Sequence, residues 1–538
     1  MKKSYLFIIT LLVLVCACRQ KELPVPTTTY GTHIGYLQLD STLLNITEIA
    51  TDINIPWDIA PGPEGYLWFT EQLGTVNLLN LKTGEKKQVL KIPDVYHKKS
   101  YGLLGFTAHP NFIKSPYIYL HYTFKIPINE TQEDIKSRIV RYTFENNTLI
   151  QPHIILDSIV GKTYHNGSRL VISPDMKLIF SMGDAGSADL AQDINHLNGK
   201  ILRLNLDGSI PNDNPFPNSF VWSWGHRNPQ GLTYSSKGQL YSSEHGPNND
   251  DEINHILKKS NYGWPNIHGY CDLENEKLYC KDSIIVAPLK AWTPTLGTAG
   301  LAYYNYTHIP KWKNSLLSVS LKGRAMRVLK LDETGDSIIN EHIYFQKRFG
   351  RLRDVCVNDK GEIFLATSNR DWHPRYQPWM YDSLPAGGDR IIKLNWVAND
   401  SLNSKNAMVI HEDTEPLKLH SEVWDFDVKD HDIGAGEKLY LTHCASCHRQ
   451  NGEGAEGLIP PLVNTDWVTG DKGKLIRAVL NGLSEPIEVN GETYEQEMPG
   501  FSNLKNEEIA DILTYIRNSF GNTANPIIPG EVYEERKN

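Results

Sequence analysis

The chain has 538 residues, of which 22% are charged and 10% aromatic, with a formal net charge of −9 and an isoelectric point near 6.1. This length allows roughly three or four domains, or fewer where an all-β barrel or propeller is present. The acidic balance argues against a nucleic acid as a partner.

The N-terminus has the pattern of a signal peptide. Two lysines precede an apolar run over residues 5–15, and small residues follow it. The run is too short for a membrane-spanning helix. Residues 15–18 (Val-Cys-Ala-Cys) resemble a bacterial lipobox, with cleavage at another position as the alternative. We therefore expect residues 1–17 to be removed, and Cys18 to anchor an exported lipoprotein in the periplasm or cell envelope. Residues 18–44 are predicted to form a tether.

Residues 45–397 are predicted to be all-β. Short runs rich in Val, Ile, Tyr, Phe and Trp alternate with Gly, Pro, Asn and Asp. A turn followed by an apolar strand recurs at residues 62–70, 173–181, 235–242 and 358–366. These turns are spaced near multiples of about 60 residues, and that unit fits this region about six times. The pattern predicts a six-bladed β-propeller with its site on the axis.

The seven cysteines fall into three groups. Two lie in the signal segment and two in a motif near the C-terminus, which leaves Cys271, Cys280 and Cys356. In an oxidising compartment Cys271 and Cys280 could bridge a loop, or both could remain thiols. Cys356 lies in an apolar stretch and is predicted to be a buried thiol.

Six long motifs carry a family resemblance, and they occur at residues 102–106, 183–186, 199–215, 225–232, 246–254 and 261–265. Over residues 45–397 the chain resembles the soluble PQQ-dependent glucose and aldose sugar dehydrogenases of the glucose/sorbosone dehydrogenase family. The resemblance implies a six-bladed propeller, PQQ and Ca²⁺ as cofactors, and a sugar substrate oxidised at C1.

The resemblance also assigns catalytic roles. His165 occupies the place of the family's base, where a neutral imidazole takes the proton of the sugar C1 hydroxyl while hydride leaves for the quinone C5 carbonyl. Arg227 matches an arginine near the C5 oxygen, where a fixed cation stabilises developing charge. Asn228 is expected to face the cofactor.

PQQ is a tricarboxylate and requires cations. Lys322, Arg351 and Arg353 match the family's lysine and paired arginines. Strand alternation places both arginines on one face, and guanidinium groups bind carboxylates in a bidentate manner. Thr295, with Trp292, lies where the family contacts cofactor or sugar.

Two calcium sites are implied by the same resemblance. Gly246 and Pro247 are expected to offer backbone carbonyls to a Ca²⁺ that bridges to PQQ, because hard cations prefer oxygen ligands. Glu252 and the Tyr262 carbonyl are expected to form a second, structural Ca²⁺ site. The alternative for Glu252 is a turn carboxylate with no ion.

Three positions depart from the family pattern. Ser100 stands where glucose-oxidising members have glutamine, Tyr164 replaces an acidic residue before the base, and His245 replaces a glutamine before the Gly-Pro pair. These positions touch the sugar or pack beside the cofactor, so their change relaxes substrate choice more than it abolishes chemistry. We therefore predict an aldose or related alcohol rather than glucose specifically.

Residues 398–430 are polar and lack periodicity, which predicts a linker. The sequence Cys-Ala-Ser-Cys-His at 444–448 has the pattern of c-type haem attachment, with Cys444 and Cys447 as thioether partners and His448 as an axial ligand. A structural zinc site would require a second ligand pair, and no Cys or His follows His448. A redox dithiol would favour a βαβ context, whereas the surroundings indicate a helix.

Met498 is the only methionine after the haem motif and is predicted to be the opposite axial ligand. Apolar residues at helical spacing predict a terminal helix near 507–520. Residues 431–522 resemble a small, all-α class I cytochrome c domain, followed by a tail at 523–538.

Together these features predict a quinoprotein dehydrogenase that passes electrons from PQQ to haem c, and then to a downstream cytochrome, quinone or oxidase. Two other classes remain open: a non-enzymatic propeller binding domain carrying the cytochrome, and a Ca²⁺-dependent lactone hydrolase. The intact set of cationic residues argues against a binding domain, and lactone hydrolysis would give no reason for a haem motif.

Overall fold

The computed structural model describes most of the chain, in several separate ranges. The predicted signal peptide, the lipobox residue Cys18 and most of the predicted linker lie outside these residues. The described residues are 30–128, 133–162, 164–247, 249–371, 388–397, 408–416, 433–522, 524, 526–527 and 529–537.

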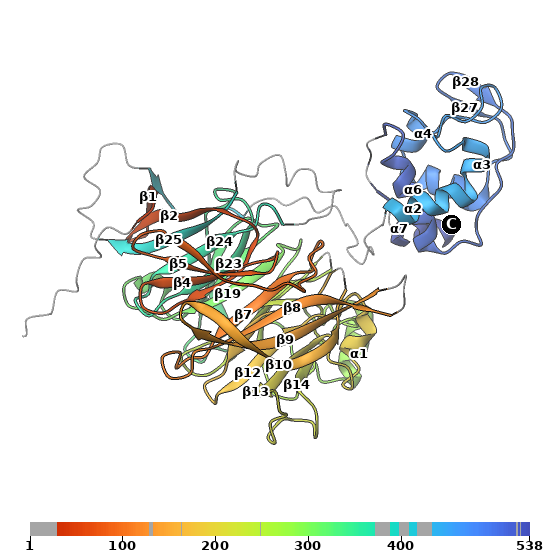
Figure 1. Ribbon diagram of the computed structural model, residues 1–538. Helices are drawn as coiled ribbons and strands as arrows, with labels where there is room; N and C mark the ends of the chain where they lie inside the picture. Colours follow the sequence, from red (N-terminus) through yellow and green to blue (C-terminus); the bar gives the residue numbers. More distant parts are fainter. Residues whose placement is uncertain are drawn as a thin grey trace, which may run out of the picture.

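Six sheets, antiparallel except for one parallel pair of strands in the last, form the larger part of the molecule, shown from red to blue-green in Figure 1. Blade one contains β3 (Pro56–Pro61), β4 (Tyr66–Glu71), β5 (Thr75–Asn80) and β6 (Lys86–Lys91). Blade two contains β7 (Leu103–Ala108), β8 (Tyr117–Pro127), β9 (Glu133–Glu145) and β10 (Thr148–Val160). Blade three contains β11 (Leu170–Ile172), β12 (Lys177–Met182), β13 (Lys200–Asn205) and β14 (Val221–Trp224).

The remaining three sheets complete the ring. Blade four contains β15 (Pro229–Tyr234), β16 (Leu240–Glu244), β17 (Asp251–Ile256) and β18 (Lys290–Trp292). Blade five contains β19 (Thr298–Tyr304), β20 (Ser315–Ser320), β21 (Met326–Leu331) and β22 (Ile338–Tyr344). Blade six contains β23 (Leu352–Val357), β24 (Ile363–Thr367), β25 (Asp389–Val397), β2 (Leu43–Ile53), β1 (Thr32–Gln38) and β26 (Val409–Ile410). The predicted six-bladed propeller is confirmed.

The ring closes in blade six, where strands from the two ends of the propeller pair. Strand β2 pairs antiparallel with β25, and β1 pairs in parallel with β26 through Tyr36 and Val409. Two predicted boundaries are therefore corrected. Residues 18–44 contribute β1 rather than only a tether, and residues 398–430 contribute β26 rather than only a linker.

Apolar cores fill the space between neighbouring blades. Trp68 of blade one packs in one cluster with Phe106 and Leu120 of blade two. Inner strands are covered on both faces, so their residues are buried without alternation, as in β20. The first strand of each blade packs against the first strand of the next, which brings the residues beside these strands to the axis.

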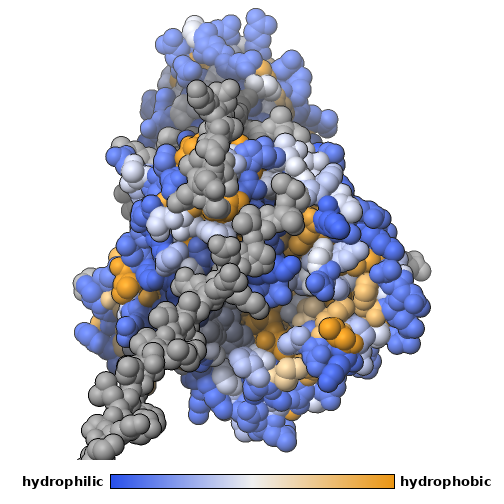
Figure 2. Space-filling view, turned by 90° about the vertical axis from the view of Figure 1, so that its left-hand side faces the viewer, coloured by the Kyte–Doolittle hydropathy of each residue, from blue (hydrophilic) through white to orange (hydrophobic). Residues whose placement is uncertain are grey.

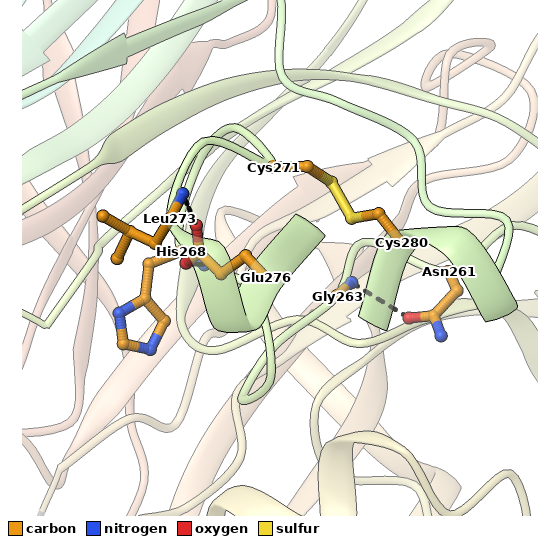
Figure 3. The surroundings of a disulfide bond; sticks show 7 residues. All are labelled: Asn261, Gly263, His268, Cys271, Leu273, Glu276 and Cys280. Carbon is orange, nitrogen blue, oxygen red and sulfur yellow. Dashed lines mark hydrogen bonds between the residues drawn. A yellow bond between two sulfur atoms is a disulfide. The ribbon is translucent and has the colours of Figure 1, made fainter. Parts of the chain in front are cut away.

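An α-helix lies between β17 and β18, and Figure 3 shows its surroundings. A disulfide joins Cys271, which precedes helix α1 (Glu274–Asp282), to Cys280 within that helix; this confirms the predicted bridge and excludes the free-thiol alternative. The Glu276 carboxylate accepts hydrogen bonds from the backbone N–H groups of His268 (3.0 Å) and Leu273 (3.1 Å). The bridge and this carboxylate fix the segment that leads from residue 261 to β18. Cys356 is a buried free thiol, as predicted.

The C-terminal domain, blue in Figure 1, is mainly helical. It contains α2 (Ile433–His443), α3 (Ala445–His448), α4 (Asp466–Thr469), α5 (Lys472–Asn481), a hairpin of β27 (Ile487–Val489) and β28 (Glu492–Tyr494), α6 (Asn506–Arg517) and α7 (Pro529–Lys537). The core is built mainly by α6, which packs with Tyr440 of α2, Ile476 of α5 and Val532 of α7. Residues 523–538, predicted as a tail, therefore supply a packed helix.

The surface in Figure 2 is mostly hydrophilic, with hydrophobic residues in several separate patches. Within the described residues, no helix is both long and apolar enough to cross a membrane.

Candidate functional site

The candidate site lies where segments enter or leave the inner strands of blades three to six. His165 precedes β11, Arg227 and Asn228 precede β15, and Arg353 lies in β23. One side chain shows that these segments converge. Burial lowers the pKa of His245 to about 3, and the charges of Arg227, Arg353 and His165 add to the effect.

His165 is held by a buried carboxylate. Its Nδ1 lies 2.8 Å from Asp184 Oδ1, and Asp184 Oδ2 accepts a hydrogen bond from Trp264 Nε1 at 2.8 Å. Burial acts to raise the pKa of Asp184, but the charges and hydrogen bond of His165 and Arg227 outweigh it and leave that pKa below its usual value. The carboxylate is therefore ionised, and it directs Nε2 of His165 away from itself.

Asp184 was not assigned a role from the sequence, although it lies in the family motif at 183–186. Glycine is required beside it, because a Cβ on Gly183 would lie 2.1 Å from the His165 carbonyl oxygen. His165 itself adopts a φ of 59°. A close approach of these two loops thus sets the geometry of His165, the predicted base.

Arg227 and Asn228 are positioned by a second buried carboxylate. Glu244 accepts hydrogen bonds from the backbone N–H groups of both residues. The Arg227 guanidinium lies 5.2 Å from the Trp264 ring centroid, and Asn228 Oδ1 accepts from Gly167 N at 3.1 Å. Asn228 thereby connects the arginine to the loop that carries His165.

Lys322 and Thr295, both predicted to contact the cofactor, lie together. Lys322 Nζ donates to Thr295 Oγ1 at 3.2 Å, and burial lowers the pKa of the lysine. Asp251, which the sequence did not single out, accepts from Gly246 N (2.9 Å) and Leu296 N (2.8 Å). This carboxylate ties the loop of the predicted calcium carbonyls to the loop of Thr295.

Arg351 and Arg353 converge on one residue. Arg351 Nη1 donates to the Asp371 carbonyl at 2.8 Å, and Arg353 forms an ion pair with the Asp371 carboxylate. Arg353 also donates to Gln230 Oε1 at 2.8 Å. The two guanidinium groups therefore meet at Asp371, one at its backbone carbonyl and the other at its carboxylate. Their role in binding the carboxylates of a cofactor stays a prediction.

One pocket brings several predicted residues together, and its wall contains Gly225, Arg227, Glu244, His245, Gly246, Pro247, Asp250, Glu252, Tyr262, Trp264, Ile267 and His268. Burial, with the neighbouring charge of Glu244, raises the pKa of Glu252 to about 8. No group of three or more His, Cys, Asp or Glu side chains within the described ranges is arranged to hold a metal ion. Trp292 lies elsewhere and donates to Glu341 at 3.0 Å.

The haem motif lies at the junction of α2 and α3. His448 Nδ1 lies 3.1 Å from the Pro460 carbonyl oxygen, an arrangement that leaves Nε2 for a metal. The backbone of Met498 pairs with that of Leu483 through two hydrogen bonds of 2.8 and 2.9 Å. Cys444 and Met498 border the same apolar core. Both predicted axial ligands therefore belong to one small domain.

Comparison with known proteins accounts for both parts of the chain. The family profile described as Glucose / Sorbosone dehydrogenase matches residues 53–373, which is more than half of the chain. The chain belongs to the glucose/sorbosone dehydrogenase family. The Cytochrome c profile matches residues 433–520 of this family member.

Individual relatives agree with this assignment. Quinoprotein glucose dehydrogenase B of Acinetobacter calcoaceticus is 32% identical over 403 residues, covering 60% of this chain and 84% of that protein. The PQQ-bound aldose sugar dehydrogenase of Streptomyces coelicolor superposes with a TM-score of 0.56 at 28% identity, covering 69% and 100% of the two chains. Cytochrome c-552 of Thermus thermophilus is 41% identical over 90 residues, covering 16% of this chain and 68% of that protein.

The residues of this glucose/sorbosone dehydrogenase family member fit PQQ. Arg227 Nε and Arg353 Nε are buried N–H donors that have no acceptor among the described residues. Buried donors of this kind require an acceptor, and the carboxylates and carbonyls of a quinone tricarboxylate provide one. The C-terminal domain likewise offers the two thiols and two axial side chains that haem c requires.

Proposed function

We propose that the protein is an exported quinoprotein dehydrogenase that oxidises an aldose sugar, or a related alcohol, at C1 and passes the electrons to its own haem c. The observation that carries the proposal is the pairing of His165 with Asp184 at 2.8 Å beside Arg227. A base held in this way lies next to buried cations, in a chain that also contains a haem-attachment motif. This combination suits oxidation of a substrate followed by electron transfer to haem.

Proton removal from the substrate is the task of His165. With Nδ1–H directed to Asp184, Nε2 carries the lone pair and accepts the proton of the C1 hydroxyl. The ionised Asp184 stabilises the imidazolium that forms. When bound, PQQ supplies a two-electron acceptor for the hydride. Arg227, buried and fixed over Trp264, provides positive charge without having to reorganise.

Calcium belongs to the proposal as well. The Gly246 and Pro247 carbonyls would hold one ion at the cofactor, and Glu252 with the Tyr262 carbonyl would hold the second. The raised pKa of Glu252 supports a cation there. A bound cation would offset both the energetic cost of burying the ionised carboxylate and its repulsion from Glu244.

Haem c would be attached through Cys444 and Cys447 and ligated by His448 and Met498. It would pass electrons to a cytochrome, quinone or oxidase of the cell envelope. The N-terminal pattern supports export and a lipid anchor at Cys18. Export also suits the proposed haem, because c-type haem is attached outside the bacterial cytoplasm.

The test uses the haem-loaded protein. PQQ and Ca²⁺ are added, a panel of aldoses is supplied, and haem absorption is followed by stopped flow. Haem reduction should require PQQ, vanish in His165→Ala and persist in the control His196→Ala, which changes an exposed histidine. Sugar-dependent reduction of PQQ with the haem left oxidised would refute the internal relay. If no sugar or alcohol reduced the haem, a lactone panel would separate a hydrolase from a binding domain.

A further inference from the structure

Trp264 connects two groups on which the proposed chemistry depends. Its indole N–H donates to Asp184 Oδ2 at 2.8 Å, and Asp184 Oδ1 lies 2.8 Å from His165 Nδ1. The centroid of the same indole ring lies 5.2 Å from the guanidinium carbon of Arg227. Trp264 is 5% exposed and forms part of the pocket wall. One side chain therefore lies against both the carboxylate that holds the predicted base and the predicted catalytic cation.

The indole is itself held in place. The backbone N–H of Trp264 donates to the Gly225 carbonyl at 3.1 Å, and the Trp264 carbonyl accepts from Gln192 Nε2 at 2.5 Å. The His268 ring stacks on the indole, with the ring centroids 5.1 Å apart and the ring planes at 29°. A buried ring fixed in this way cannot turn away from Asp184 without losing these contacts. The indole N–H is therefore a donor of fixed position.

This donor restricts the hydrogen bonds that residue 184 can make. An indole only donates hydrogen bonds, and an ionised carboxylate only accepts them. With the indole N–H on Oδ2 and the Gly186 N–H on Oδ1 at 2.7 Å, both oxygens of Asp184 face donors. Nδ1 of His165 must then be protonated in order to pair with Oδ1, which leaves the lone pair on Nε2.

We propose that Trp264 is a positioning residue for the proposed oxidation: its indole N–H fixes the Asp184 carboxylate and, through it, the tautomer and orientation of the His165 ring. The role in catalysis rests on the proposed function, whereas the control of the tautomer does not. Without the indole N–H, Oδ2 would lose this donor and the carboxylate could rotate. Proton removal would then slow, because fewer imidazole rings would present the lone pair of Nε2 in a fixed direction.

The first test is a double-mutant cycle with Asp184→Asn, read as haem reduction by an aldose with PQQ and Ca²⁺ present. Trp264→Phe keeps an aromatic ring and should lower kcat about tenfold, with KM changed less than about twofold. In Asp184→Asn the amide NH₂ group must face an N–H, either that of Trp264 or those of His165 and Gly186. Removal of the indole N–H lets the NH₂ group face residue 264 while the amide oxygen accepts from the other two. The double variant should therefore be about threefold or more faster than Asp184→Asn alone.

The second test reads the tautomer of His165 directly and needs neither PQQ nor sugar. The haem-loaded protein is labelled with ¹⁵N-histidine, and the His165 signals are assigned by their loss in His165→Ala. The shifts of the ring nitrogens should report a proton on Nδ1 in the unaltered protein and in the double variant. Asp184→Asn alone should contain more of the form with its proton on Nε2.

The matched control is Trp312→Phe. Trp312 is a buried tryptophan in the 3₁₀ turn at Pro310–Trp312, and its Nε1 donates to Tyr344 Oη at 3.2 Å. The change should neither lower kcat nor restore activity to Asp184→Asn. If Trp264→Phe restored neither activity nor the Nδ1 proton in the Asp184→Asn background, or if Trp312→Phe restored them equally, the role of Trp264 would be overturned. The expected tautomers in a protein that oxidised no sugar would overturn the proposed function and still support control of the tautomer by Trp264.

Discussion

Replacement of Asp184 by asparagine tests the origin of basicity at His165. Asp184 Oδ1 accepts from His165 Nδ1 at 2.8 Å and from Gly186 N at 2.7 Å, and Oδ2 accepts from Trp264 Nε1 at 2.8 Å. All three of these neighbours are donors. An amide must therefore place its NH₂ group against another N–H, whichever way it turns.

The size of the effect follows from these contacts. A hydrogen bond to a charged group contributes about 1.5–3 kcal/mol, so its loss slows proton removal about 10- to 150-fold. If the NH₂ group turns toward His165, the ring is driven to the tautomer with its proton on Nε2, and the loss approaches the ~10⁴-fold caused by the equivalent change in serine protease triads. We expect Asp184→Asn to lower kcat/KM about 100-fold or more.

The assay is steady-state haem reduction by an aldose across a pH series, with PQQ and Ca²⁺ present. The acid limb of the profile should move to lower pH, because loss of a negative charge favours the neutral imidazole. Asp189→Asn is the control, since Asp189 lies in the neighbouring 3₁₀ turn (Ala188–Ala191) and is exposed. A fall of less than about threefold, or an equal fall in the control, would refute the reasoning.

Three further predictions concern stability and the haem. Because the pKa of Glu252 is raised from 4.5 to about 8, the native protein without calcium binds more protons than the unfolded chain in this window. Its unfolding temperature should therefore fall as pH rises from about 4.5 to 8, and calcium or Glu252→Gln should flatten the slope in calorimetry. Serine at both Cys271 and Cys280, nine residues apart, should cost about 2–3 kcal/mol of unfolding free energy, and reductant should then have no further effect. Met498→His should lower the haem potential in a redox titration, since methionine raises it, whereas Met408→Leu at an exposed position should not.

The repeat was readable from sequence because it is local. The four recurring segments each span the turn between the first and second strands of a blade, in blades one, three, four and six. Blades two and five connect the same strands by longer segments, with the 3₁₀ turn at Pro310–Trp312 in blade five, so they lacked the signature. A tight turn beside an apolar strand is encoded by neighbouring residues. The partners of β1 and β26 lie far away in the chain and left no such local pattern.

The site shows the same division. From their motifs the sequence predicted roles for His165, for the cations Lys322, Arg351 and Arg353, and for the haem ligands, because each motif contains the side chains concerned. These roles stay predictions. The groups that position these side chains, such as Asp184, did not stand out, since an isolated carboxylate carries no sign of what it will contact.

By itself, then, the sequence predicted the six-bladed class, which the structure confirmed, and it supplied the motifs on which the proposed cofactors and the proposed haem attachment at residues 444–448 depend. Only the tertiary structure decided which carboxylates contact His165 and the backbone of Arg227, and that residues 529–537 pack as a helix. The physical reason is that closing a ring of blades brings distant loops to one axis. Hydrogen bonding there depends on distances that no local pattern records.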